Sequence, residues 1–172
     1  MSRDTSSAAP EPWLRGPMQG VHPSLAPLLY SFEQAREDLE KWTVSLTDEH
    51  VWATPLGLAP VGFHLRHIAG SVERLMTYVR GEDLSEAQIT MLRREKEPGA
   101  SRQELLKNVQ VAFENAECIV RQIDPATLAH RREVGRKRLP STVGGLLTHI
   151  AEHTQRHLGQ AIITAKVVLA SS

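Results

Sequence analysis

Apolar residues recur at intervals of three and four along four long stretches of the chain. This spacing is the periodicity of a helix that buries one face. The stretches cover, in order, about residues 24–46, 61–80, 101–123 and 142–169. No segment gives a convincing strand pattern. The sequence therefore predicts an all-α protein, with a four-helix bundle as its default architecture.

Helix-end signals support these boundaries. Ser101 and Glu104 are spaced as a capping box at the start of the third helix. Gly81 stands where a C-terminal cap of the second helix belongs. Ser141 or Thr142 is expected to cap the fourth helix.

The connections between the long helices carry weaker signals. Pro55 and Pro60 interrupt the first connection, where residues 48–52 could form a short helical turn. Residues 84–93 could form a further short helix in the second connection. The third, residues 124–140, is predicted to be a basic loop with a brief helix after Asp124. Its arginines favour a solvated loop over an anion-binding site.

Length and composition indicate one domain. The chain has 172 residues, of which 41% are hydrophobic and 23% charged, as is ordinary for a globular protein. Residues 1–22 are rich in Ser, Ala, Pro and Gly, and we expect a flexible tail there, followed by a single helical domain over residues 23–172.

Charge, cysteine content and hydropathy exclude several classes of protein. The net charge is zero, so no broad basic field is present to bind nucleic acid. No apolar run approaches the ~20 residues that span a membrane, and the N-terminus has no secretory hydrophobic region. The single cysteine, Cys118, excludes an internal disulfide and fits a reducing cytoplasm. Its neighbours Ile119 and Val120 favour a buried structural thiol.

Histidines stand at steps of four in the fourth helix. They are His149, His153 and His157, and His157 lies one turn from His153 and about 40° round the helix. Gln160 falls about 20° from His153, on the same face. Two imidazoles stacked in this way can bind one metal ion from one side.

Two more histidines, His64 and His67, lie in the second helix. A lone histidine on an apolar face is usually a hydrogen-bonded core residue. Five histidines in two helices favour a metal site instead, because stacked imidazoles without a cation leave many buried N–H groups to satisfy. We predict the ligands His67, His153 and His157, and expect supporting or pocket-lining roles for His64, His149 and Gln160, with neither spare histidine excluded as a ligand.

A set of three histidines leaves at least one coordination position open, as in catalytic rather than structural zinc sites. The ion would acidify a bound water or stabilise a thiolate at neutral pH. Imidazole ligands suit zinc, nickel, copper or iron, so the spacing alone does not name the metal.

A rival motif overlaps the same helix. Residues 149–153 match H-x-x-E-H, in which two histidines bind zinc and the glutamate acts as base. That motif expects a further acidic ligand downstream, and residues 154–172 contain no Asp or Glu. It would also leave His157 without a role, so we do not favour it.

These histidines resemble the two motifs of the DinB/YfiT-like superfamily. The resemblance rests on residues 62–68 and on 153–160, where His-x-x-x-His-x-Gly-Gln is complete, with support from residues 46–52 and 78–81. It covers about residues 23–170 and implies an up-down-down-up four-helix bundle. It also implies a divalent metal, often zinc or nickel, bound in a cleft by His67, His153 and His157. Relatives include transferases that use low-molecular-weight thiols and a maleylpyruvate isomerase branch, and many form homodimers.

Two functional hypotheses follow. In the first, the protein is a metal-dependent thiol transferase or hydrolase that acts on a small molecule. In the second, it is a non-catalytic, dimerising bundle whose metal site is structural or vestigial. The first requires an open coordination position and loss of activity with the metal.

Overall fold

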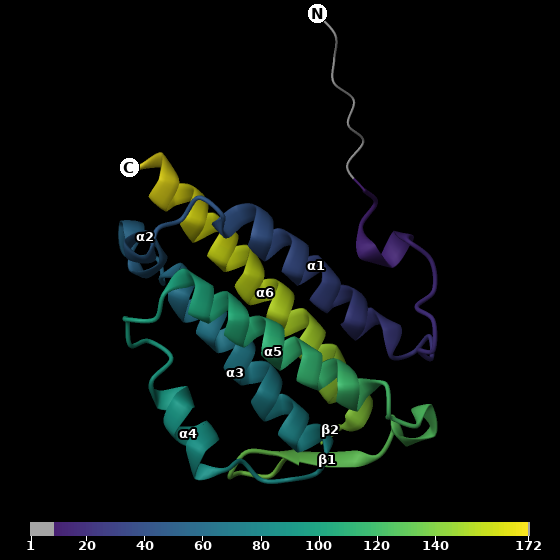
Figure 1. Cartoon of the computed structure of the whole chain (residues 1–172). Coiled ribbons are helices and arrows are strands. Elements are labelled where there is room, and N and C mark those ends of the chain that lie inside the picture. The colour runs from purple at the N-terminus through teal and green to yellow at the C-terminus, as the bar shows by residue number, and fades with distance from the viewer. Residues whose placement is uncertain (1–8, 172) are drawn as a thin grey trace, which may run out of the picture.

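Four long helices run side by side in the computed structural model, which describes residues 9–171 (Figure 1). They are α1 (Ala26–Thr43), α3 (Val61–Val79), α5 (Arg102–Val120) and α6 (Val143–Ala170). Short helices α2 (Asp48–Trp52) and α4 (Glu86–Arg93) lie in the connections. Single 3-10 turns occur at Pro12–Leu14, Pro55–Gly57 and Pro125–Thr127. The predicted all-α four-helix bundle is confirmed.

Contacts between the helices give their directions. The side chain of Gln155 on α6 bonds Ser31 near the start of α1, and the Lys166 ammonium lies 4.0 Å from the centre of a Trp42 ring near its end, so α1 and α6 are parallel. The Thr164 hydroxyl donates to the carbonyl of Ala59 just before α3, so the far end of α6 meets the start of α3.

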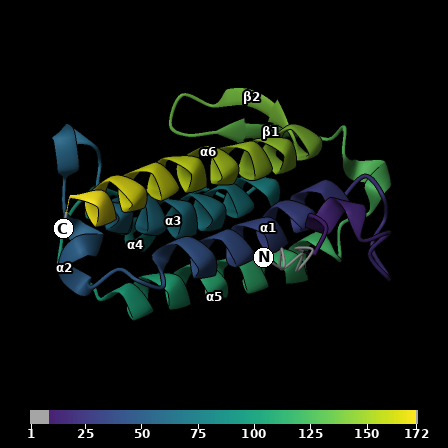
Figure 2. The ribbon, with the colours of Figure 1, turned by 90° about the horizontal axis from the view of Figure 1, so that it is seen from above.

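Helices α3 and α5 run the other way. One pocket between them is lined by Arg66 of α3 and Glu104 of α5, and a second pocket is lined by Arg80 and Ile119. Residue numbers thus increase in the same direction along both helices, which makes the two helices parallel. The order is therefore up, down, down, up, and Figure 2 shows α6 above α3 in the stack.

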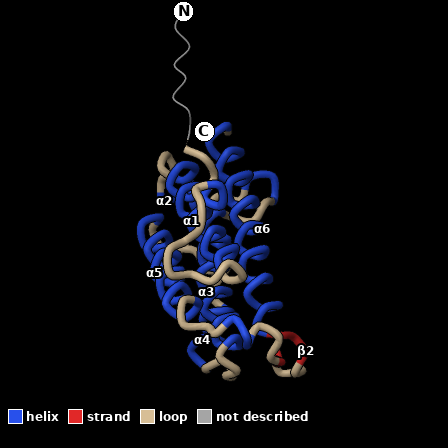
Figure 3. The backbone as a smooth tube through the Cα atoms, turned by 90° about the vertical axis from the view of Figure 1, so that its right-hand side faces the viewer, coloured by secondary structure: helices blue, strands red, loops and turns tan. Residues whose placement is uncertain are grey.

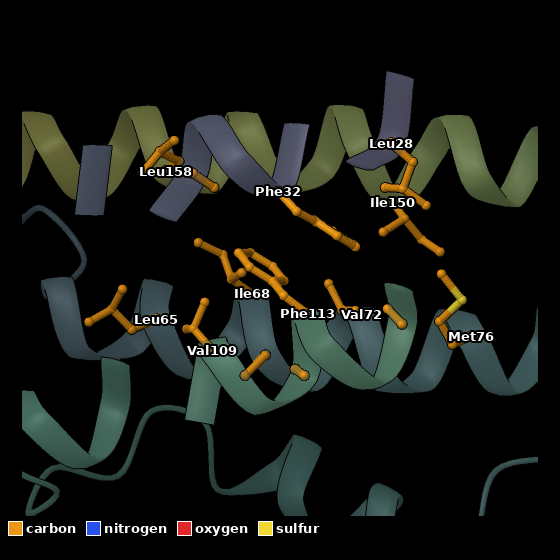
Figure 4. Close-up of a cluster of buried hydrophobic side chains, with 14 of the residues drawn as sticks. Leu28, Phe32, Leu65, Ile68, Val72, Met76, Val109, Phe113, Ile150 and Leu158 are labelled. Atoms are coloured by element: carbon orange, nitrogen blue, oxygen red, sulfur yellow. The ribbon is translucent and has the colours of Figure 1, made fainter. Parts of the chain in front are cut away.

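The core lies where the four helices face inward. Phe32 of α1 and Phe113 of α5 stack with ring centroids 4.3 Å apart and an interplanar angle of 14°. Ile68, Val72 and Ile150 belong to the same buried cluster (Figure 4). Stacked aromatic rings add stability beyond the area they bury, so the Phe32–Phe113 contact fastens α1 to α5 across the core.

Cap signals in the sequence are borne out. The Ser101 hydroxyl accepts from the Glu104 amide and the Glu104 carboxylate accepts from the Ser101 amide, which forms the predicted capping box. Gly81 has a φ of +80°, the left-handed conformation that ends helices.

A β-hairpin replaces part of the predicted basic loop. β1 (Arg131–Val134) pairs antiparallel with β2 (Leu139–Thr142) at one end of the bundle (Figure 3). The prediction of no strand was wrong here, because two four-residue strands with mostly polar side chains show no apolar alternation. The hairpin is fastened to α3 by a hydrogen bond from Arg132 Nε to the Val79 carbonyl.

The prediction for Cys118 was also wrong. Its side chain is exposed. It lies two residues, or about 200°, from both Ala116 and Val120, which face the core. A helix turns the intervening residue to solvent even when its neighbours are apolar.

Part of the predicted tail lies outside the described residues, which begin at residue 9. Residues 9–22 lie against α1: Arg15 forms an ion pair with Glu37, and the Tyr30 hydroxyl donates to the Gly16 carbonyl. Within residues 9–171, the structure contains no helix with the length and apolarity that a membrane crossing requires.

Candidate metal centre

Three imidazole rings meet at the seam between α3 and α6. Nε2 of His67 lies 2.8 Å from Nε2 of His153. The ring of His157 has its centroid 4.3 Å from that of His67 and 4.5 Å from that of His153. One nitrogen of each ring lies within 4.8 Å of the other two. The structure thus brings together the three residues selected from the sequence.

Helix geometry explains the convergence. His153 and His157 stand one turn apart on one face of α6. The antiparallel helix α3 presents His67 to that face, and the Phe63 ring stacks on His67 with a centroid distance of 5.5 Å. All three histidines are half-buried. Two rigid helices therefore position the cluster, and no loop residue is needed to complete it.

His153 and His157 are neutral at physiological pH. Burial, reinforced by the neighbouring histidines, lowers the pKa of His153 to about 4. Burial and the adjacent His67 also lower the pKa of His157. Neutral imidazoles expose nitrogen lone pairs, the form in which histidine binds a metal.

The donor set fits a divalent cation. Two Nε2 atoms 2.8 Å apart either share one proton or both face a cation. In addition, Nδ1 of His153 is buried without a hydrogen-bond partner, so only the contact of Nε2 with His67 bears on the tautomer of this ring. A cation on Nε2 would fix it, with the proton on Nδ1.

His67 is backed by a buried ion pair. Its Nδ1 lies 2.7 Å from Oε2 of Glu95, a residue in the turn after α4, and Oε1 of Glu95 lies 2.8 Å from Arg74. Burial would raise the pKa of Glu95, but the hydrogen bond from His67 and the charge of Arg74 together lower it. The carboxylate is therefore ionised.

Neither Glu95 nor Arg74 is predicted from the sequence. Glu95 lies in a run of charged residues, where nothing distinguishes it from its neighbours. Arg74 carries a weak signal, because it stands seven residues after His67 on the apolar helix α3 and so shares its face.

A comparison with family models places the chain. The model of the DinB superfamily matches residues 31–161. The chain belongs to the DinB superfamily. No curated protein matches it.

A solved structure shares the fold of this DinB-superfamily chain. It is YfiT from Bacillus subtilis, described as "a probable metal-dependent hydrolase with an unusual four-helix bundle topology". The TM-score is 0.64, at 14% sequence identity, over 88% of this chain and 91% of YfiT. At this identity the likeness shows a common fold.

His64 and Gln160 lie at a pocket beside the cluster of this DinB-superfamily member. Nδ1 of the buried His64 is 3.0 Å from Nδ1 of His157, and burial lowers the pKa of His64 to about 4. Both residues line a cavity of about 660 Å³, together with Leu58, Arg156 and Ile163. The pocket therefore adjoins the imidazoles and has a largely apolar wall.

His149 lies outside the three-histidine cluster. Its ring centroid is 5.2 Å from that of His153, and its Nδ1 is 3.4 Å from the Glu152 carboxylate. Glu152 is itself exposed and pairs with Arg156. His149 and Glu152 of the H-x-x-E-H match are thus largely exposed, whereas His153 faces His67 on α3.

Proposed function

We propose that this protein is a metal-dependent enzyme of the DinB superfamily that holds a divalent cation, zinc or nickel, on His67, His153 and His157. One observation carries the proposal: a nitrogen from each of these three rings lies within 4.8 Å of the other two. The description of YfiT supports a hydrolase. The alternative reaction is transfer to a low-molecular-weight thiol, as in the transferases of the superfamily that the sequence resembles.

A cation held by His67, His153 and His157 would keep its full positive charge and would make a bound water or thiol more acidic. The chain's own residues supply the rest. Glu95 accepts a hydrogen bond from the Nδ1–H of His67, which leaves the lone pair on Nε2 of that ring free to bind a metal. Phe63 covers one face of the His67 ring and limits its contact with water.

The pocket beside the cluster suits a substrate of mixed polarity. Leu58 and Ile163 give it an apolar wall, and Gln160 and Arg156 add polar groups. A second cavity, of about 500 Å³, lies on the other side of Leu58 and Ala59 and is lined by Trp52, Phe63 and Lys96. We propose that a small-molecule substrate binds in the pocket beside the cluster, with a low-molecular-weight thiol as co-substrate if the reaction is a transfer.

We further propose that the protein is a cytoplasmic homodimer. Leu169 and Ile163 are exposed apolar side chains on α6, and Ile163 also lines the pocket beside the cluster. They favour a covering partner, in keeping with the homodimers of the resembling family. The same observation favours the second candidate function, a non-catalytic dimerising bundle, so dimerisation does not decide between the two.

Metal analysis and activity assays distinguish the metal-dependent enzyme from the non-catalytic bundle. We expect purified protein to carry about one zinc or nickel per chain, and His67→Ala or His157→Ala to lose both the metal and activity against a panel of esters, amides and thiol acceptors. His130→Ala is the matched control, because His130 is exposed and distant in the sequence from the cluster. Full activity after complete removal of metal would contradict the enzyme proposal, and metal without any activity across the panel would favour the non-catalytic bundle.

A further inference from the structure

The turn after α4 is held against α3 from several sides. Arg66 on α3 donates from Nη1 to the carbonyls of Arg94 and Glu97, and its guanidinium lies 4.8 Å from the centre of a Trp52 ring. Glu95 stands between those two carbonyls in the chain. The backbone on both sides of this carboxylate is therefore fixed to the helix that carries His67.

The Glu95 carboxylate contacts α3 through both of its oxygens. Oε2 faces Nδ1 of His67 at 2.7 Å, and Oε1 faces Nη1 of Arg74 at 2.8 Å. The side chains of Glu95 and Arg74 are 7% and 9% exposed. Removing one partner of a buried ion pair leaves the other charge uncompensated. The positions of Arg74 and Glu95 therefore depend on each other.

Gly70 makes room for this pair. It lies between His67 and Arg74 on the same helix, and a Cβ added to it would lie 2.6 Å from Arg74 Nη1 and 2.8 Å from Glu95 Oε1. Both distances are shorter than van der Waals contact allows. The ion pair therefore rests directly on bare helix backbone, and any side chain at position 70 must displace it.

We propose that Arg74 and Glu95 are positioning residues for His67, seated on Gly70, and that they set the metal affinity of the site. Glu95 Oε2 holds the proton on Nδ1 and so directs the Nε2 lone pair toward His153. Arg74 holds Oε1 and stops the carboxylate from turning away. This inference rests on the proposed function, because the ring is positioned for a cation.

Partners of this kind fix the tautomer and orientation of a ligand, and their loss typically lowers metal affinity 10- to 100-fold. The test is zinc affinity measured by competition with a chromophoric chelator. We expect Glu95→Ala to weaken binding by about 10- to 100-fold. Glu97→Gln is the matched control, since Glu97 is an exposed carboxylate on the same turn, paired with Arg94, and should leave affinity unchanged.

Gly70→Ala separates positioning from loss of a charge. It keeps Arg74, Glu95 and His67 but displaces the ion pair, so zinc binding should weaken although every polar group remains. Because alanine favours helix over glycine, unfolding of α3 is not the expected cause. Circular dichroism of each variant checks this.

A second readout needs no metal. Imidazole ¹⁵N chemical shifts of His67 should report a proton on Nδ1 in the metal-free wild type and a mixture of tautomers, or the Nε2–H form, in Glu95→Ala. A merely structural role for Glu95 would lower stability and leave the tautomer unchanged.

The outcomes separate the two proposals. A wild-type protein that binds neither zinc nor nickel overturns the proposed function and this inference with it. Normal wild-type binding with equal affinity in Glu95→Ala and Gly70→Ala overturns only the positioning role. An equal loss in Glu97→Gln also overturns it, because the effect would then belong to general charge on the turn.

Discussion

The two halves of the seam between α3 and α6 bury different chemistry. One half is apolar and includes Val72, Met76 and Ile150. The other half carries the imidazoles that meet at His67 and His153. Apolar contacts stabilise in proportion to the area removed from water and need no direction. Imidazoles need partners for each ring nitrogen, and Nδ1 of His153 has none.

This difference separates stability from function along one pair of helices. An unsatisfied buried polar atom costs about 1–3 kcal/mol, so the imidazole half is the weaker of the two in the metal-free protein. A cation that binds only the folded state would offset that cost. The apolar half can hold the helices in place while the other half is free of its ligand.

The largest expected effect is on stability alone. Met76→Ala should lower the free energy of unfolding by about 2–5 kcal/mol, because it leaves a cavity in the apolar half. Zinc affinity should stay within about twofold of wild type, since Met76 lies more than two turns along α3 from His67. Urea unfolding and chelator competition measure the two quantities.

Met91→Ala is the matched control for this variant, because Met91 is 59% exposed on α4. It should change stability by no more than about 0.5 kcal/mol. If Met76→Ala weakened zinc binding as strongly as it weakened the fold, the two halves would not be separable, and the comparison would fail.

The sequence predicted the apolar half and the histidines for the same reason. Both repeat at helical spacing, so Ile150, His153 and His157 could be assigned to a face of one helix from their spacing alone. The choice of His67 rested on its place in the middle of the apolar stripe of the second helix, and spacing alone left His64 open as a ligand.

Glu95 and the hairpin could not be predicted in this way. Glu95 reaches His67 across 28 residues through a turn that Arg66 fixes, and no local period encodes that distance. The hairpin has too few residues for an alternating pattern and depends on Arg132 bonding the end of α3. Contacts between separate elements determine the position of Glu95 and the formation of the hairpin, and residue spacing within one element does not reveal such contacts.

Acidification should lower the free energy of unfolding through the imidazole half, by a smaller amount than Met76→Ala does. In the metal-free folded protein the pKa of His64 is lowered from 6.5 to about 4, chiefly by burial. Between these values the unfolded chain binds more protons than the folded one, so stability rises with pH there and is lost as pH falls from about 6.5 toward 4. We expect a loss of about 2–3 kcal/mol from this residue.

Urea unfolding at pH 7 and pH 4.5, in wild type and in His64→Leu, measures this contribution. Carboxylates also titrate in this range, so the difference between the two proteins isolates the imidazole. His64→Leu should lose less stability on acidification, whereas Met76→Ala should keep the wild-type slope. Equal slopes in wild type and His64→Leu would show that His64 is solvated in the folded state.

The smallest expected effect concerns His149, which decides between the two motifs on α6. Its side chain is 49% exposed and contacts the exposed Glu152, and surface ion pairs contribute about 0–1 kcal/mol. His149→Ala should therefore change the free energy of unfolding by less than about 0.5 kcal/mol and leave zinc affinity unchanged.

His157→Ala is the control for this variant, and the pair of substitutions is informative because spacing cannot choose between them. Residues 149 and 157 each lie one turn from His153, about 40° to either side of it. The position of α3 breaks this symmetry, because His67 approaches His157 with ring centroids 4.3 Å apart. If His149→Ala abolished zinc binding and His157→Ala did not, the inverted H-x-x-E-H motif would hold the metal, and α3 would supply no ligand.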